Sequence, residues 1–276
     1  MSAAARIAAA FGFLLTATVV CAQEAASLPN GNTYVRNVLR SGPRSQDAAI
    51  NDYSYDIEEV QENLNKQGVA TSRDTLRYEV YFVERRPVRR LISRNGAPLS
   101  STEQADVDRK AAALAKAISE GRTVSEQAGL RLASLVESFD FETLLREDRA
   151  GRKTLVFEFK PKPGAAAKSG TNSITDAVAA ILTGQVHIDE QDRRVVLLEA
   201  HSLEGRKVGV RTGVKLGKFE LSMEYTSVAD GVWLPKKIVS VAAGRAFLFK
   251  TFRIRKTTTY SNYRRFSINT EERPAS

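Results

Sequence analysis

Cysteine, histidine and tryptophan are scarce in this chain of 276 residues, which contains one Cys, two His and one Trp. The single cysteine, Cys21, has no partner for an intramolecular disulfide, so the fold must be stabilised by packing. His187 and His201 fall on separate predicted strands, beside polar neighbours and without the spacing of zinc ligands. The sequence therefore predicts no disulfide framework, no metal site and no cofactor.

Signatures of catalysis are missing as well. The nucleophile elbow Gly-x-Ser-x-Gly does not occur in the sequence. Asp189, Glu190 and Asp192 crowd one predicted turn, where contact with water should leave the pKa of each carboxyl little changed. We therefore expect a protein that is not an enzyme. The competing hypothesis is an enzyme with a polar pocket that holds matched acid and base groups.

The apolar run near the N-terminus is too short for a membrane-spanning helix. It covers residues 7–20, about 14 residues, whereas a spanning helix needs ~20. Arg6 precedes the run and the small residue Ala22 follows it, which indicates a cleavable signal peptide over residues 1–22 and export to the periplasm. An uncleaved anchor is one alternative. Lipid attachment at Cys21 is another, and Val20 disfavours it because lipoprotein signals normally have a small residue before the cysteine.

The charge balance is strongly basic, with a formal net charge of +9. Such a balance suits anionic lipid headgroups or an acidic partner, although solvated sheet faces would also account for it. Nucleic acid is not expected as a partner, because the chain is predicted to be exported and carries no recognition motif. Two basic runs, residues 85–90 and 253–256, could ring the mouth of a groove. Alternatively they form a solvated edge that deters strand addition.

Alternation of apolar and polar residues is the main structural signal, and it is clearest over residues 184–266. Successive strand side chains face opposite sides of a sheet, so this alternation predicts a large antiparallel sheet with one apolar face. We expect about eleven strands, at 51–58, 76–82, 88–93, 139–141, 155–159, 185–188, 193–201, 206–212, 215–226, 231–241 and 246–264.

Capping boxes predict the few helices. Ser100 with Glu103 indicates a helix over about 102–119, and Thr123 with Glu126 indicates another over about 124–137. A third, short helix is expected over 174–182, after an exposed loop at 161–173. Residues 23–50 resemble a flexible N-terminal arm, with a short helix around 34–39.

Two short motifs accompany this pattern. Residues 186–195 (VHIDEQDRRV) form a strand, an acidic turn and a strand, and residues 225–235 (YTSVADGVWLP) contain Asp-Gly-x-Trp-x-Pro. With the exported, disulfide-free sheet, they resemble the bacterial outer-membrane lipoprotein carrier superfamily of LolA, LolB and RseB-like half-barrels. The resemblance implies a mainly β (α+β) half-barrel over residues 51–266, with helices packed in the concave face and a C-terminal tail at 267–276.

This architecture places the candidate binding site on the apolar face of the sheet. Aromatic rings and a flexible thioether suit an irregular apolar ligand, although the same residues could simply pack beneath the helices. The candidate lining residues are Tyr53, Tyr55, Leu76, Tyr78, Val80, Phe82, Phe219, Leu221, Met223 and Tyr225. A lid is expected to expose Ile174, Val178, Ile181 and Leu182 to the ligand. Trp233 is expected to be a structural anchor behind a turn.

The expected function is therefore the binding of lipid or lipoprotein acyl chains in the cell envelope, as a monomeric carrier or chaperone. Two alternatives use the same fold. One is an RseB-like sensor that passes a signal to an envelope membrane protein. The other is a structural envelope protein whose helices fill the groove.

Overall fold

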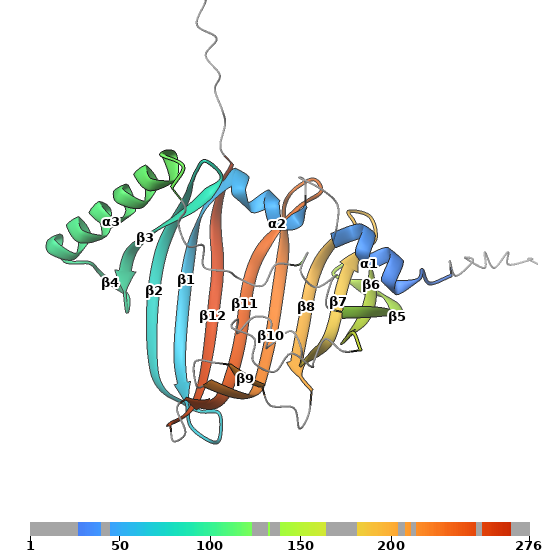
Figure 1. Ribbon diagram of the computed structural model, residues 1–276. Helices are drawn as coiled ribbons and strands as arrows, with labels where there is room; N and C mark the ends of the chain where they lie inside the picture. The colour runs from blue at the N-terminus through green and yellow to red at the C-terminus, as the bar shows by residue number, and fades with distance from the viewer. Residues whose placement is uncertain are drawn as a thin grey trace, which may run out of the picture.

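Antiparallel strands make up most of the structure, which is a computed structural model (Figure 1). It describes residues 27–39, 45–122, 132, 139–163, 181–203, 208–210, 214–246 and 250–265. The helices are α1 (Gly31–Leu39), α2 (Gln46–Ala49) and α3 (Ser101–Ser119), with a 3-10 turn at Ile50–Asp52. The strands are β1 (Tyr53–Leu64), β2 (Ala70–Val83), β3 (Arg86–Arg94), β4 (Ala97–Pro98), β5 (Phe139–Arg149), β6 (Arg152–Pro161), β7 (Leu182–Asp189), β8 (Arg194–Ser202), β9 (Val208–Val210), β10 (Val214–Ala229), β11 (Val232–Ala246) and β12 (Lys250–Arg265).

All of these strands belong to one curved sheet that does not close on itself (Figure 1). Eleven of them follow the order β4-β3-β2-β1-β12-β11-β10-β8-β7-β6-β5, and β9 pairs with β10 beside this path. The last strand, β12, lies between β1 and β11, so the first and the last long strand are neighbours in the sheet. The predicted fold class, a curved antiparallel sheet of about eleven strands, is confirmed.

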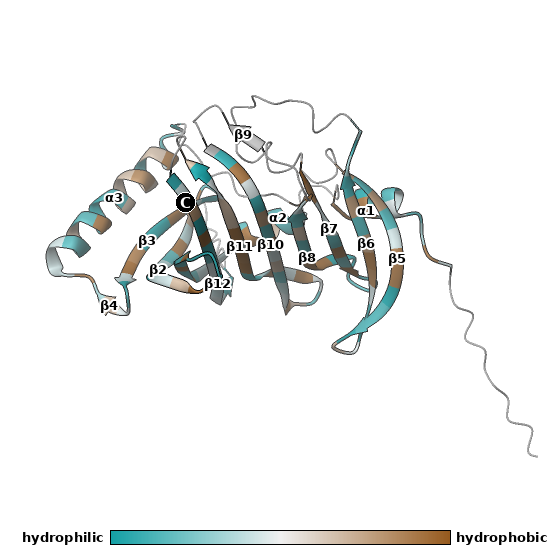
Figure 2. Ribbon diagram, turned by 90° about the horizontal axis from the view of Figure 1, so that it is seen from below, coloured by the Kyte–Doolittle hydropathy of each residue, from teal (hydrophilic) through white to brown (hydrophobic). Residues whose placement is uncertain are grey.

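The strand register shows which side chains share a face, because residues directly opposite each other point the same way. Ile57 of β1 lies between Tyr78 of β2 and Tyr260 of β12. Thr258 precedes Tyr260 by two residues on β12 and therefore lies on the same face. From Thr258, a row of directly opposite residues crosses the sheet through Ile238, Met223, Leu198, Val186 and Phe157. We call this side of the sheet the core face. Figure 2 shows hydrophobic colouring along β6, β7 and β8, which supply much of the buried cluster on it.

Helix α3 lies on the opposite face of the sheet. Ala111 and Ile118 of the helix are buried against Val88, and half-buried Tyr81 and Val83 pack with them. Since Tyr81 and Val83 alternate with Val80 and Phe82 of the core face, the helix must cover the other side of β2 and β3. The helix and its capping box at Ser100 are confirmed. Helix α3 can pack on this face because β2 carries apolar residues on both of its faces.

The N-terminal segment packs into the core, so the prediction of a flexible arm over residues 23–50 is wrong for its described part. Val35 of α1 is fully buried, and Val38 and Leu39 pack with it in the main cluster. The side chain of Gln46 in α2 donates to the Val195 carbonyl (2.7 Å) and accepts from the Val195 amide (2.9 Å). The three buried aliphatic residues of α1 are a weak signal for a helix in the sequence. They share one face of the helix, and α1 packs beside β5.

Several predicted segments lie outside the described residues. They include the signal peptide at 1–22, the C-terminal tail at 267–276, and most of the helices predicted at 124–137 and 174–182. Leu132, from the first of these helices, is helical and buried. The second helix was expected to end at Leu182, but Leu182 is the first residue of β7, and both it and Ile181 are buried. Leu182 is thus part of the main core, whereas Ile174 and Val178 lie outside the described residues.

Candidate functional site

The ten residues predicted to line a binding face all lie on the core face, but they fall into two separate groups. Those on β10 belong to the main core. Leu221, Met223 and Tyr225 are buried, and half-buried Phe219 packs against the same cluster. Their neighbours include Leu198 and other buried side chains from β5 to β8. These four residues therefore contribute to the stability of the fold.

Most of the predicted residues on β1 and β2 contribute to a second apolar cluster, near the β4 end of the sheet, whereas Leu76 lies outside it, opposite Glu59. Tyr55, Ile57 and Val80 are buried in it. The other members are only half buried, and they are Ile50, Tyr78, Phe82, Tyr260 and Tyr263. Tyr53 joins its margin through an edge-on contact with Tyr263 (6.1 Å between ring centroids). We call the rings of Tyr53, Tyr55, Tyr78, Phe82, Tyr260 and Tyr263 the aromatic patch.

Tyr55 is the centre of the aromatic patch. Its ring centroid lies 5.4 Å from that of Tyr263, 5.8 Å from that of Tyr260 and 6.2 Å from that of Phe82. These separations are typical of favourable ring contacts. The patch therefore presents a continuous aromatic surface, part of which remains accessible on the core face.

Tyr260 and Tyr263 are functional candidates that the sequence pattern did not identify. They are three residues apart, so strict alternation would place them on opposite faces. The pairing of β1 with β12 shifts between Ser54 and Asp56, and Asn262 opposite this shift has a positive φ of 55°. This irregularity brings both rings against Tyr55. An Asn between two tyrosines, next to the end of a strand, is the only signal that could have suggested a bulge.

Three phenol groups of the patch are held in the neutral form. Burial raises the pKa of Tyr55, Tyr260 and Tyr263 well above the ordinary value of 10.0, because an ionised phenolate would lose its hydration. The Tyr263 hydroxyl donates to the Pro235 carbonyl at 2.5 Å, which orients that ring. The patch thus offers apolar ring faces without buried charge.

A group of charged residues borders the patch on the same face. Glu59 follows Ile57 by two residues on β1, and it is bound by two cations. Arg89 Nη2 lies 2.6 Å from Glu59 Oε1, and Lys256 Nζ lies 3.1 Å from Glu59 Oε2. The Arg89 guanidinium also lies 4.3 Å from the centroid of the Tyr78 ring. Burial alone would raise the pKa of Glu59, but Arg89 and Lys256 outweigh it and hold this pKa below the usual value.

These two cations come from the basic runs that were expected to ring a groove or form a solvated edge. Their chain neighbours point to the other side of the sheet. Arg90 pairs there with Glu79 (2.9 Å) and with Asp108 of α3 (3.1 Å), and Arg255 pairs with Glu62 (3.3 Å). Strand alternation therefore places cations of each run on both faces of the sheet.

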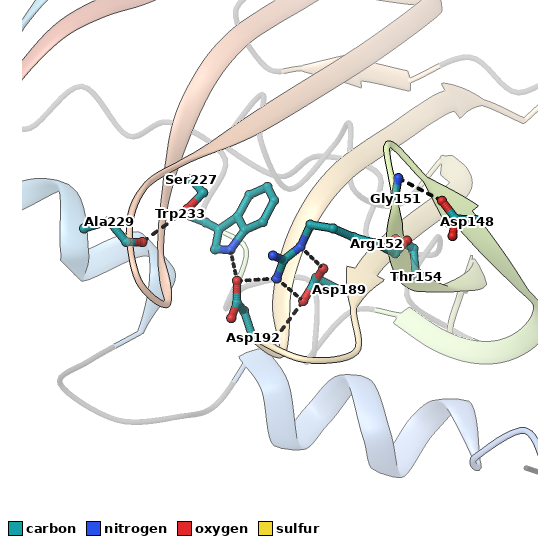
Figure 3. Close-up of polar contacts among 9 residues, drawn as sticks. All are labelled: Asp148, Gly151, Arg152, Thr154, Asp189, Asp192, Ser227, Ala229 and Trp233. Atoms are coloured by element: carbon teal, nitrogen blue, oxygen red, sulfur yellow. Dashed lines mark hydrogen bonds and ion pairs between the residues drawn. The ribbon is translucent and has the colours of Figure 1, made fainter.

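A second polar centre joins three hairpin turns at one end of the sheet (Figure 3). Arg152 Nε and Nη2 donate to Asp189 at 2.6 and 2.9 Å, and Arg152 Nη2 also donates to Asp192 at 2.6 Å. The indole of Trp233 donates to Asp192 at 2.8 Å. The acidic turn and the Asp-Gly-x-Trp element, far apart in sequence, therefore meet here, and Trp233 is buried as a structural anchor.

Asp189 corrects one expectation about the acidic turn. Its residue exposure is only 1%, so it is not in contact with water as a turn carboxylate was expected to be. Burial would raise its pKa, but Arg152 and the backbone amides of Asp192 and Gln191 lower it overall. A carboxylate held ionised in this way is suited to joining turns and is poorly suited to transferring protons.

The described residues contain no group of three or more metal-ligating side chains. His187 is buried in β7 with Nδ1 3.0 Å from Glu147 Oε1, and His201 is exposed on β8. Among the helices that the structure describes, none is long and apolar enough to cross a membrane. Neither histidine therefore belongs to a recognisable metal site in this part of the chain.

The architecture belongs to the class of open, curved antiparallel sheets with accessory helices. Several solved structures are similar to the chain. No family model and no curated protein matches it. A putative outer membrane lipoprotein-sorting protein domain from Vibrio parahaemolyticus is 14% identical, with a TM-score of 0.40 and coverage of 88% of this chain and 94% of that one. A DUF1329 family protein from Desulfovibrio piger is 11% identical, with a TM-score of 0.33 and coverage of 87% and 95%.

A third similar structure is MucB from Pseudomonas aeruginosa, solved with MucA. It is 10% identical, with a TM-score of 0.27 and coverage of 86% of this chain and 99% of that one. The resemblance expected from the sequence is thus found among solved structures. At these identities and TM-scores the similarity is distant, and it assigns neither a family nor a function to the chain.

Proposed function

We propose that this protein is an exported cell-envelope protein that binds a lipid or an acyl chain against the aromatic patch of the core face. The observation that carries the proposal is the different filling of the two apolar clusters. In the main cluster, side chains from α1, β5 to β8, β10 and β11 bury one another. In the second cluster, four aromatic side chains are only partly buried on the same face.

The half-exposed rings can supply enough binding energy for such a ligand. Each methylene transferred from water to an apolar surface contributes about 0.8 kcal/mol, so ten methylenes would contribute on the order of 8 kcal/mol before ordering costs. The neutral phenols add no charge that the ligand would have to displace. A chain lying across Tyr55, Phe82 and Tyr260 would therefore be held mainly by apolar contact.

The alternative is a sensor or interaction module that binds another envelope protein. The edge strand β5 favours this alternative, because Leu144 and Leu145 on it are 38% and 46% exposed. The first part of this edge is already occupied. Asn32 accepts a hydrogen bond from the Phe141 amide (3.0 Å), and Thr143 donates to the Pro29 carbonyl (2.5 Å). A partner strand would therefore have to add to the second half of β5.

Native mass spectrometry of the mature protein, purified from its own envelope without detergent and then extracted with organic solvent, tests the proposal. We expect a stoichiometric lipid or acylated peptide. Phe82→Asp should abolish its retention, because a carboxylate at this position places charge among the rings. Leu145→Asp is the matched control, since it adds the same charge at an exposed site on β5.

A folded Phe82→Asp variant that keeps its lipid would contradict the assignment of the site. Wild-type protein that is repeatedly isolated empty and also rejects added lipids would contradict the lipid-binding function. In that case a structural or protein-binding role would be favoured. Circular dichroism of each variant establishes that it is folded before lipid retention is compared.

A further inference from the structure

On three strands of the core face, charged residues lie within one or two same-face positions of the second apolar cluster. On β1, Ile57 of this cluster is followed two residues later by Glu59. On β12, stepping back from Tyr260 through Thr258 leads to Lys256. On β3, Arg89 lies opposite Val80 of the second apolar cluster. An apolar surface and a charged group therefore adjoin each other, as the two parts of an amphiphile do.

The charged group has an excess of positive charge. Arg89 and Lys256 share the single carboxylate of Glu59, so the three side chains together carry one net positive charge. The cations remain accessible, because the side chain of Lys256 is 44% exposed and that of Arg89 is 32% exposed, whereas that of Glu59 is 14% exposed. An approaching ligand would meet the cations before it met the carboxylate.

Lys256 has capacity for a further partner. Its ammonium has three N–H donors, and Glu59 is its ion-pair partner among the described residues. Arg89 connects the two parts of the surface, since its guanidinium lies over the ring of Tyr78, a member of the aromatic patch. A ligand lying on the patch would thus place its polar end within reach of both cations.

We infer that Arg89 and Lys256 bind the anionic headgroup, a phosphate or a carboxylate, of the amphiphile whose acyl chain lies on the aromatic patch. This inference rests on the proposed function and adds the chemical class of the ligand to it. Glu59 positions the two cations and, by its own charge, limits their attraction for anions. The protein therefore discriminates between headgroups by charge and between chains by apolar contact.

Binding of two amphiphiles with the same acyl chain, a lysophospholipid with an anionic phosphoglycerol headgroup and an uncharged monoacylglycerol, tests the inference on the mature protein below the concentrations at which they aggregate. We expect the wild type to prefer the anionic probe by about tenfold, because charge-assisted hydrogen bonds are stronger than neutral ones. Lys256→Gln should reduce this preference to about threefold or less and leave the affinity for the uncharged monoacylglycerol unchanged.

Arg255→Gln is the matched control. Arg255 is the next residue on the same strand, but it points to the opposite face and pairs with Glu62 at 3.3 Å. This variant should retain the full preference. Glu59→Gln should increase the preference for the anionic probe by severalfold, because it removes the negative charge that competes with the ligand. If Glu59 only stabilised the fold, the preference would stay unchanged.

The possible outcomes separate the inference from the function on which it rests. Equal affinity of the wild type for both probes would overturn the headgroup assignment and leave acyl-chain binding intact. Binding of neither probe would overturn both. Inorganic phosphate serves as a third probe: if it binds as tightly as the anionic lysophospholipid, the site takes free anions and the assignment to an amphiphile fails.

Discussion

Asp189 is the carboxylate whose neutralisation should cost this protein the most stability. It is 1% exposed, it accepts two hydrogen bonds from Arg152 at 2.6 and 2.9 Å, and it accepts one from the Asp192 amide at 2.7 Å. The variant Asp189→Asn keeps the size of the side chain. It removes the charge and replaces one acceptor oxygen by an amide that would face the guanidinium.

The magnitude follows from the burial of both partners. Removing one member of a buried ion pair costs about 3–5 kcal/mol. The side chain of Arg152 is 36% exposed and can regain part of its hydration, so we expect a decrease of about 2–4 kcal/mol in the free energy of unfolding. Urea denaturation followed by circular dichroism measures this difference directly.

Glu190→Gln is the control for this prediction. Glu190 is the next residue in the same turn, and it also pairs with an arginine, Arg146, at 2.7 and 2.9 Å. Both of these side chains are more than a quarter exposed, so the loss should be about 1 kcal/mol or less. If the two variants lose the same free energy within about 0.5 kcal/mol, the reasoning from burial is refuted.

The pH dependence of stability offers an independent check on Asp189. Its pKa in the folded state lies below the ordinary value of 3.8, so folding favours the ionised form. The stabilisation is fully present above the unfolded-state pKa, and it is lost as the pH falls through the folded-state pKa. Below about pH 4, wild-type stability should therefore fall more steeply with decreasing pH than that of Asp189→Asn. Parallel curves would show that Asp189 does not contribute to this slope.

Two further predictions concern the N-terminal segment. Gly31→Ala should lower the free energy of unfolding by about 1–3 kcal/mol, because a Cβ at this position would lie 2.6 Å from the Phe141 carbonyl oxygen. Gly217→Ala is the control, since the nearest atom to its Cβ would be 3.7 Å away, and it should be close to neutral in thermal unfolding. Equal effects would contradict the close approach of α1 to β5. Gln46→Leu should cost about 2 kcal/mol, since it removes both hydrogen bonds to Val195. Unchanged amide exchange of Val195 in this variant would refute the contact.

Much of the sheet could be predicted from local pattern alone. The alternation from Phe219 to Tyr225 identified β10 and its buried side, because strand geometry forces alternate side chains to opposite faces. Ser100 and Glu103 located the start of α3, because a capping box satisfies amides within four neighbouring residues. These signals act over a few residues, so the chain expresses them without reference to the rest of the fold.

The contents of each face could not be predicted in the same way. The alternation in β2 shows that Val80 and Tyr81 point to opposite sides of the sheet. It does not show that α3 covers Tyr81 or that Val80 belongs to the second apolar cluster. Tyr260 and Tyr263 share a face only because β12 is irregular where it pairs with β1. The choice depends on which strands become neighbours, and that is a property of the whole sheet.

The sequence by itself determined that this protein is a mainly β chain with one long antiparallel sheet and few helices. Tertiary structure alone decided that Arg89 and Lys256, 167 positions apart, meet at Glu59 beside the aromatic patch. The physical reason is the sheet order, in which the last strand, β12, pairs with the first long strand, β1. Contacts between such distant residues leave no local pattern, because they arise only when the strands have paired.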